Sequence, residues 1–378
     1  MRIGWCNRGY PNTRLILDKV PGIEYVHSRS YAAAILRIAH KVKLPCKGVF
    51  KFGTSFNGGT SSDKVDLYHL FNQIGVGLCK RPFVTTFETS LPRCLNVGDY
   101  WWYKSIEAMT SSRCKRLIAF SECTREIQLR AKKVPDVSDR LTVLHPPQEV
   151  LTDAEDLKRR QDRKGVLKFF FVGRDFFRKG GGEALRALAR IRKGYPVEVW
   201  AIGDFKHVDY ASSWTTDSQE VTARLIETNK DWIHYAPSLP NERIIELMKT
   251  CDVGLLPTRA DTYGYSVLEM QACGLPVITT DVRALPEINN EGCGWMIKGC
   301  GVRDGTHTYG EADYSSPEKL RELSEKIEEG VYKACAAIVS IPSSVREKAV
   351  RAVARIQRDH DPIRYGMKLG TIYKEALA

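Results

Sequence analysis

The sequence predicts an α/β protein with two parallel-sheet domains. Over residues 1–150, short apolar runs recur between polar or helical segments, a pattern typical of parallel strands joined by helical crossovers. Residues 152–164 are dense in charge and contain little to bury, which indicates a linker or a surface helix. The strand and helix patterns then resume, so we expect the second half to form a separate Rossmann-like sheet. With 378 residues, the chain is long enough for each half to bury its own core.

Individual elements follow from apolar periodicity and from turn residues. In the first half we expect a strand within the first six residues and further strands at 23–27, 48–52, 67–71, 82–87, 117–120 and 142–144. Helical spacing covers 31–42, and Ser121 is typical of a helix N-cap. In the second half we expect strands at 168–172, 197–202, 232–235, 253–256 and 277–280, and helices at 182–192 and 241–249. Residues 345–378 are helical again.

The composition excludes several protein classes. A hydrophobic share of 43% and a charged share of 27% are those of a soluble globular protein, and no run approaches the roughly 18 apolar residues of a membrane span. The first residues pass directly into a strand-like run, so we expect no secretory signal. The eleven cysteines include no Cys-x-x-Cys pair, which argues against a zinc site and a disulfide framework. We therefore expect a reducing, cytoplasmic location.

The positive charge is concentrated in the first half. Residues 1–150 contain 23 Lys and Arg against 12 Asp and Glu, whereas residues 151–378 contain 34 against 33. Basic clusters at 41–43, 113–116 and 130–133 would attract an anionic membrane or a nucleic acid, and solubility alone explains any single cluster equally well. Confinement of the excess to one domain favours a peripheral contact with the inner face of a membrane over a nucleic acid partner.

The segment 261–278 carries the most chemical information. Ser266 with Glu269 three residues later matches a capping box, so we expect a helix to begin there, with its free N–H groups facing the loop at 263–265. A helix start of this kind attracts phosphate groups. Gly274 and Pro276 then stop the helix and a buried strand follows.

This segment resembles the signature of the family 4 retaining glycosyltransferases of the GT-B fold. In that signature a Glu, seven residues and a second Glu precede an Ala-x-Gly-x-Pro-Val run. Asp261 stands here in the first position and Glu269 in the second. The resemblance implies that Asp261 binds hydroxyls of the transferred sugar and that Glu269 binds the ribose of the donor nucleotide. The shorter Asp departs from the family pattern.

The resemblance also implies an architecture. In the GT-B fold two Rossmann-like domains face each other across a cleft. We expect residues 1–150 to form the acceptor-binding domain and residues 166–345 to form the nucleotide-sugar-binding domain. Residues 346–378 are expected to form a C-terminal helix that crosses back and packs on the first domain.

Two basic residues after an apolar strand resemble the family's Gly-Arg and Lys-Gly element. The resemblance implies that Arg174 and Lys179 grip the donor's diphosphate, where a cation about 4 Å away stabilises the leaving group by a few kcal/mol at an effective dielectric of about 20. We therefore expect neither a metal nor a cofactor beyond the nucleoside diphosphate sugar, which is a co-substrate. The one Asp-x-Asp run, Asp359-His360-Asp361, precedes Pro362 and is expected to be a solvated turn.

The first domain supplies weaker candidates. Glu88 directly follows the strand at 82–87 and is assigned to positioning the acceptor hydroxyl, with a structural ion pair to Arg93 as the alternative. Asn7 and Gly9 follow the first strand and could line the cleft. His69 alternates like a strand residue and is expected to be a hydrogen-bonded core histidine. The other expected substrate-binding residues lie in the second domain and are Gly203, Tyr263, Gly264, Tyr265, Ser266 and Val267.

Together these features predict a retaining, metal-independent glycosyltransferase. It would move a sugar from a nucleoside diphosphate sugar to a hydroxyl of a glycan or lipid-linked saccharide, as in surface polysaccharide assembly. Retention is implied by the resemblance alone. Three alternatives stay open at this point: a DNA-modifying glycosyltransferase of the same fold, a sugar-nucleotide epimerase, and a non-catalytic nucleotide-sugar-binding protein.

Overall fold

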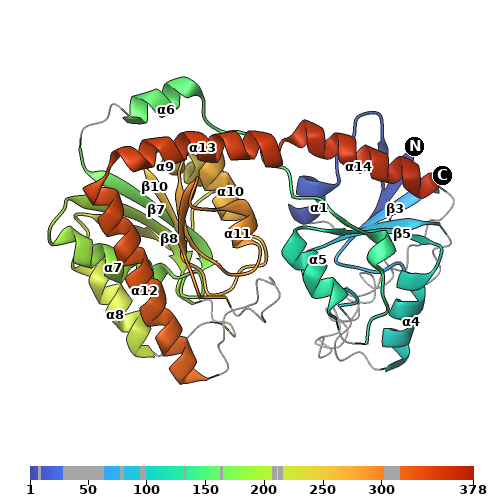
Figure 1. Cartoon of the computed structure of the whole chain (residues 1–378), viewed down its shortest axis with the longest axis horizontal. Helices are drawn as coiled ribbons and strands as arrows, with labels where there is room; N and C mark the ends of the chain where they lie inside the picture. Colours follow the sequence, from blue (N-terminus) through green and yellow to red (C-terminus); the bar gives the residue numbers. More distant parts are fainter. Residues whose placement is uncertain are drawn as a thin grey trace, which may run out of the picture. The chain divides into compact units, whose positions relative to one another are not determined.

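The computed structural model divides the chain into two compact units, Met1–Pro147 with His360–Ala378, and Gln148–Asp359 (Figure 1). It describes residues 1–6, 10–28, 64–76, 81–93, 99–131, 133–161, 165–206, 211, 216–301 and 316–378. The expected strand at 48–52, the expected helix at 31–42, and the candidate site residues Asn7 and Gly9 lie outside the described residues.

The first unit contains a parallel sheet whose described strands follow the order β2-β1-β3-β4-β5-β6. These strands are β1 (Arg2–Trp5), β2 (Glu24–His27), β3 (Leu67–Phe71), β4 (Phe83–Phe87), β5 (Cys114–Ala119) and β6 (Leu141–Val143). The described helices before the final one are α1 (Tyr10–Leu15), α4 (Asp99–Thr110), α5 (Glu122–Leu129) and the 3-10 turn η2 (Ser138–Arg140). Ser121 caps α5 by accepting a hydrogen bond from the Thr124 N–H at 3.0 Å, so the predicted helix start is confirmed.

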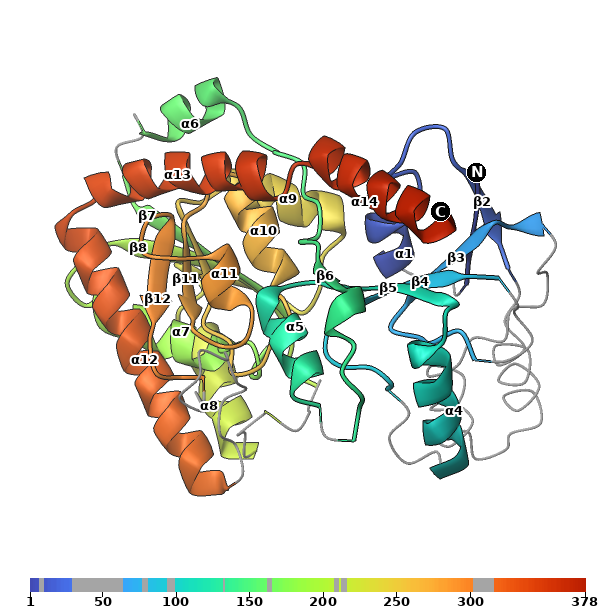
Figure 2. The same ribbon diagram turned by 45° about the vertical axis from the view of Figure 1, so that its right-hand side comes forward.

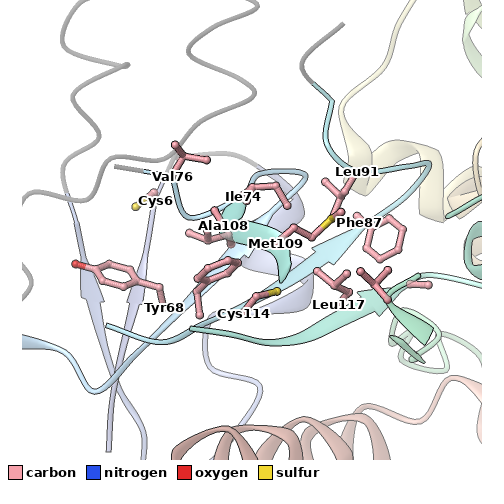
Figure 3. Close-up of a cluster of buried hydrophobic side chains, with 14 of the residues drawn as sticks. Cys6, Tyr68, Ile74, Val76, Phe87, Leu91, Ala108, Met109, Cys114 and Leu117 are labelled. Atoms are coloured by element: carbon pink, nitrogen blue, oxygen red, sulfur yellow. The ribbon is translucent and has the colours of Figure 1, made fainter. Parts of the chain in front are cut away.

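Both faces of the first sheet are buried. Side chains alternate along a strand, and accordingly Phe83 and Phe87 of β4 join one apolar cluster whereas Val84 between them joins another. Figure 3 shows the first cluster, which Met109 of α4 shares with Phe87 and Leu117. The second cluster contains the apolar side of the last helix, α14 (Pro362–Leu377). The terminal helix is therefore part of the core of the first unit.

His69 belongs to β3, and its side chain contacts α14. It is fully buried, its Nδ1 lies 2.6 Å from the Tyr373 hydroxyl, and its Nε2 lies 2.7 Å from the Thr86 hydroxyl. Burial lowers the pKa of His69 from 6.5 to about 3, because the charged imidazolium would lose its hydration. The expectation of a hydrogen-bonded core histidine is confirmed.

The buried His69 predicts a pH-dependent stability of the first unit. Below pH 6.5 the unfolded chain binds a proton at His69 that the folded protein excludes until about pH 3, so the free energy of unfolding falls as the pH falls through this window. Between pH 7.5 and pH 5 this residue should remove about 2 kcal/mol of stability. Urea unfolding at the two pH values measures the loss. The variant His69→Gln keeps hydrogen-bonding groups but cannot titrate, and an equal loss in that variant would contradict the assignment.

The second unit contains another parallel sheet, with the strand order β12-β11-β10-β7-β8-β9. Its strands are β7 (Leu167–Asp175), β8 (Val197–Asp204), β9 (Ile233–Ala236), β10 (Val253–Leu256), β11 (Val277–Thr280) and β12 (Gly294–Ile297). Its described helices are α6 (Ala154–Gln161), α7 (Gly181–Arg192), α8 (Thr216–Glu227), α9 (Asn241–Thr250), α10 (Tyr265–Ala272), α11 (Leu285–Ile288), α12 (Pro317–Ser340) and α13 (Ser343–Asp359). This is the strand order of the Rossmann fold, and α12 lies against α7 and β12 (Figure 2).

Residues 346–378, expected to be a single helix on the first domain, are divided between the two units. α13 packs with α6, α10 and β12 inside the second unit, and only α14 belongs to the first. The break occurs where Pro362 begins α14 and the Asp361 carboxylate caps it, accepting from the Arg364 N–H at 2.6 Å. Proline cannot continue the preceding helix, and this is the physical reason for the correction.

The Asp-x-Asp run is part of this helix junction. Asp359 is exposed and binds Arg358 at 2.8 Å, while His360 is buried with its Nδ1 2.8 Å from the Pro146 carbonyl oxygen. Since Asp361 is the cap of α14, the expectation of a turn is confirmed, although its histidine is not solvated.

The basic excess follows the division into units. The first unit contains 26 Lys and Arg against 13 Asp and Glu, and the second contains 31 against 32. Within the described ranges, no helix combines the length and the hydropathy of a bilayer span.

Candidate functional site

The candidate site lies at the carboxyl ends of β7 and β10. The chain runs from β7 outward to β8 and β9, then returns to β10 and runs the other way to β11 and β12. The strand order therefore reverses between β7 and β10, which are hydrogen-bonded neighbours. Ligands of open α/β sheets bind outside such a switch point. Arg174 lies at the end of β7 and Lys179 follows it, whereas Asp261 and Gly264 follow β10.

Lys179 and Asp261 form a direct ion pair. The Lys179 Nζ lies 2.5 Å from the Asp261 Oδ2, and both side chains are 14% exposed. The other oxygen of Asp261 accepts from the backbone N–H groups of Tyr263 at 3.2 Å and Gly264 at 3.0 Å. Burial alone would raise the pKa of Asp261, but the Lys179 ammonium and the Tyr263 N–H hold it below its ordinary value. The carboxylate is thus ionised, and it joins the ammonium to the turn before α10.

The turn before α10 is a glycine turn. Gly264 has φ +94° and is the N-cap of the helix, and a Cβ at this position would lie 2.6 Å from Leu285 Cδ2. The predicted helix start behind the 263–265 loop is confirmed, but the capping box is wrong. Because the helix begins at Tyr265, Ser266 already lies inside its first turn, and no side chain from the described part of the chain caps this end. The Asp261 carboxylate instead accepts hydrogen bonds from the Tyr263 and Gly264 N–H groups, which explains why the helix begins before Ser266.

The other predicted residues of this segment differ in accessibility. The side chains of Tyr263 and Val267 are buried in the core, so only their backbone groups remain for binding a ligand. Tyr265, Ser266 and Glu269 are half-buried. Half-burial leaves these three side chains partly accessible on the first turns of α10.

Two predicted residues lie at the ends of neighbouring strands. Arg174 is exposed at the end of β7. Gly203 is at the end of β8, where its carbonyl accepts a hydrogen bond from the Tyr235 hydroxyl at 2.9 Å. A Cβ at Gly203 would lie 2.3 Å from the Gly173 carbonyl oxygen, so close contact between β7 and β8 requires glycine at this position.

Glu88 lies in the first unit, after β4. Its carboxylate binds Arg93 at 3.1 Å and accepts from the Asn72 side-chain amide at 3.0 Å, and the Glu88 N–H donates to the same side chain at 3.1 Å. The ion pair with Arg93 is confirmed. The role of Glu88 toward an acceptor hydroxyl stays a prediction.

Two features of the site have no clear sequence signal. Aromatic rings gather at the carboxyl ends of β7 to β9, where Phe205 lies 4.6 Å from Phe176 and 5.0 Å from Tyr235 between ring centroids. The second feature is Arg259, a buried cation two residues before Asp261. The aromatic residues are scattered along the chain, and a sequence does not reveal which of many arginines is buried.

Comparison with known proteins connects this geometry to a family. Residues 153–306, all within the second unit, match the family model described as Glycosyl transferases group 1. Over these residues the second unit is similar to the group 1 glycosyltransferases. The matched range includes Lys179 and Asp261 with their neighbouring residues, so the candidate site lies within the matched segment.

Individual relatives are similar over part of their length. The chain is 36% identical over 126 residues to the O-antigen biosynthesis protein RfbC of Myxococcus xanthus, covering 32% of this chain and 9% of that protein. It is 23% identical over 315 residues to the MMP alpha-(1->4)-mannosyltransferase of Mycolicibacterium hassiacum, covering 76% and 72%. The first curated relatives that it matches are covered over only 9% to 38% of their own lengths.

Solved structures extend the likeness to both units. The Anabaena protein Alr3699/HepE, solved in complex with UDP, matches with a TM-score of 0.61 and 12% identity, over 99% of each chain. The expected GT-B fold is confirmed by such neighbours. At this identity the likeness shows the fold alone.

Proposed function

We propose that the protein is a retaining, metal-independent glycosyltransferase that uses a nucleoside diphosphate sugar. The observation that carries the proposal is the pairing of Lys179 with Asp261 at the switch point of the sheet, within the segment that matches the group 1 glycosyltransferases and beside the helix start at Gly264. An ammonium group and the N–H groups of a helix start both favour a bound diphosphate. The similar Anabaena protein was solved with UDP, which supports a nucleotide donor.

The second unit supplies the groups that we assign to the donor. Arg174 and Lys179 would bind the diphosphate and stabilise the charge that develops on the leaving group. An ammonium group has three donors, so it can bind a carboxylate and a phosphate at the same time. Glu269 would bind the ribose hydroxyls, and Asp261 those of the transferred sugar.

The acceptor side of the proposal rests on the first unit. We assign Glu88 to positioning the acceptor hydroxyl, whose proton passes to the departing phosphate as the new glycosidic bond forms. Displacement on one face of the sugar retains its configuration without an enzymatic nucleophile. The name of the Myxococcus relative supports a surface polysaccharide as the product, and the basic excess of the first unit supports a lipid-linked acceptor at an anionic membrane.

A thermal-shift screen tests the donor assignment. UDP, GDP, ADP and their sugars are each added with EDTA present, and a ligand at 100 times its dissociation constant should stabilise the protein by about 2.7 kcal/mol. We expect stabilisation by the nucleotides of one base. The single variants Asp261→Ala and Glu269→Ala should weaken turnover of that sugar donor. Unchanged turnover in both variants, or stabilisation that requires a divalent metal, would contradict the proposal.

Three further measurements separate this proposal from its alternatives. Product analysis without acceptor would reveal an epimerase, and a salt-dependent shift of DNA would reveal a DNA-modifying enzyme. Binding of a donor without any turnover would indicate a non-catalytic binding protein. The anomeric configuration of the product, determined by NMR, tests retention.

A further inference from the structure

The segment after β10 is tied to the segment after β7 through a buried arginine, Arg259. Its side chain is 3% exposed, its Nη1 donates to the Phe177 carbonyl at 3.1 Å, and its Nη2 binds the Glu183 carboxylate of α7. Its backbone N–H donates to the Arg178 carbonyl at 2.9 Å. Arg259 therefore holds the two carbonyl groups that come immediately before Lys179.

Arg178 and Thr258 add further hydrogen bonds between the same two segments. The Arg178 Nη1 donates to the Ala260 carbonyl at 3.0 Å, and the Thr258 hydroxyl donates to the Arg178 carbonyl at 3.2 Å. Asp261 follows Ala260, and Lys179 follows Arg178. The ladder of hydrogen bonds consequently ends at the Lys179–Asp261 ion pair.

The buried pair of Arg259 and Glu183 is not arranged for maximal stability. The Nε of Arg259 and the Oε2 of Glu183 are buried and have no hydrogen-bond partner within the part of the chain that the structure describes. Removing two charges from water is unfavourable, and a buried pair recovers this loss only when its remaining donors and acceptors are also bonded. What distinguishes Arg259 is therefore its position between the segment after β7 and the segment after β10.

We propose that Arg259 is a positioning residue for the nucleoside diphosphate. It fixes Lys179 relative to Asp261 and the turn at Gly264, so that the ammonium group meets the diphosphate without reorganisation. A guanidinium group suits this role because its planar fork donates to a carbonyl and a carboxylate at once, which an ammonium group cannot reproduce with the same geometry. This inference rests on the proposed function.

Calorimetric titration with UDP and with uridine tests the inference. The ratio of the uridine dissociation constant to that of UDP measures the gain from the diphosphate, and general damage to the site would weaken both ligands. In Arg259→Lys we expect this ratio to fall at least tenfold while the affinity for uridine stays within threefold. The double variant Arg259→Met with Glu183→Met should show the same fall in the ratio. It removes both buried charges together, so it replaces Arg259→Lys in the test if that variant fails to fold.

Arg190→Met is the matched control. Arg190 joins α7 to α12 by donating to Glu329 at 3.0 Å, and this contact involves neither Glu183 nor the segments that carry Lys179 and Asp261. This variant should lower the thermal midpoint and leave the ratio unchanged.

The outcomes separate the inference from the function on which it rests. Folded Arg259 variants with the wild-type ratio would overturn the inference alone. If the thermal-shift screen identifies guanine or adenine as the base, the titration uses guanosine with GDP, or adenosine with ADP, in place of uridine with UDP. Wild-type protein that binds none of the three nucleoside diphosphates would overturn both the proposed function and this inference.

Discussion

Replacing Lys179 by methionine is expected to lower kcat/KM for the nucleoside diphosphate sugar by about 100- to 1,000-fold. The ammonium group lies at the switch point, and it would face the leaving phosphate when its charge develops. Methionine keeps much of the side-chain volume but removes the charge. The variant also leaves the Asp261 carboxylate with less compensation, so a lower thermal midpoint should accompany the lower rate.

Lys168→Met is the control for this substitution. Lys168 lies near the amino end of β7 and forms an ion pair with Glu198 at 3.6 Å, so the variant has the same change in net charge at the opposite edge of the sheet. Its kcat/KM should stay within about twofold of wild type, because this half-buried ion pair is partly open to solvent, contributes at most about 1 kcal/mol to stability and lies away from the site. Nucleotide release from the donor, followed by a coupled assay, measures both variants. Comparable rates in the two variants would refute the role of Lys179.

Among the glycine substitutions, Gly180→Ala is expected to lower the free energy of unfolding the most. Gly180 has φ +82° at the N-cap of α7, and an added Cβ would lie 2.1 Å from the Pro257 carbonyl oxygen. A left-handed conformation disfavours alanine by about 1–2 kcal/mol, and forcing backbone apart in a packed region adds about 1–3 kcal/mol. The free energy of unfolding should fall by about 3 kcal/mol, and donor binding should weaken because the loops of Lys179 and Asp261 move apart.

Two other glycines separate the causes of this loss. Gly22 has φ +74°, and no atom of the described residues lies within 4 Å of an added Cβ, so Gly22→Ala tests the conformational effect alone and should lower stability by about 1–2 kcal/mol. Gly194 has no positive φ and has open space around it among the residues that the structure describes, so Gly194→Ala should change stability by less than about 1 kcal/mol. Urea unfolding followed by circular dichroism measures all three. A loss in Gly180→Ala no larger than in Gly22→Ala would show that the contact with Pro257 relaxes freely.

Local signals in the sequence predicted most of the secondary structure. β10 and β11 occupy the expected ranges, because a short apolar run between turn residues favours one buried strand. The cap at Ser121 was predictable since it joins residues only three positions apart. The capping box at Ser266 was wrong for a related reason. Asp261 and the positive φ of Gly264 decide where that helix begins, and a pattern that compares Ser266 with Glu269 does not include them.

The candidate site was predicted in its residues but not in its arrangement. The motif around Asp261 and the Gly-Arg and Lys-Gly element were visible along the chain, yet neither indicates that one oxygen of Asp261 binds Lys179 while the other holds the turn. The burial of Arg259 depends on Glu183 and Ser324, which lie 76 and 65 positions away. The first-domain residues Asn7 and Gly9 stay predictions.

By itself, the sequence determined that two Rossmann-like halves form and which cations and carboxylates lie at their strand ends, because periodicity and turn chemistry act over a few residues. Only the tertiary structure decided that Lys179 and Asp261, 82 positions apart, are a single ion pair. That contact exists because β7 and β10 are hydrogen-bonded neighbours in one sheet, and the pairing of distant strands depends on the packing of the whole unit.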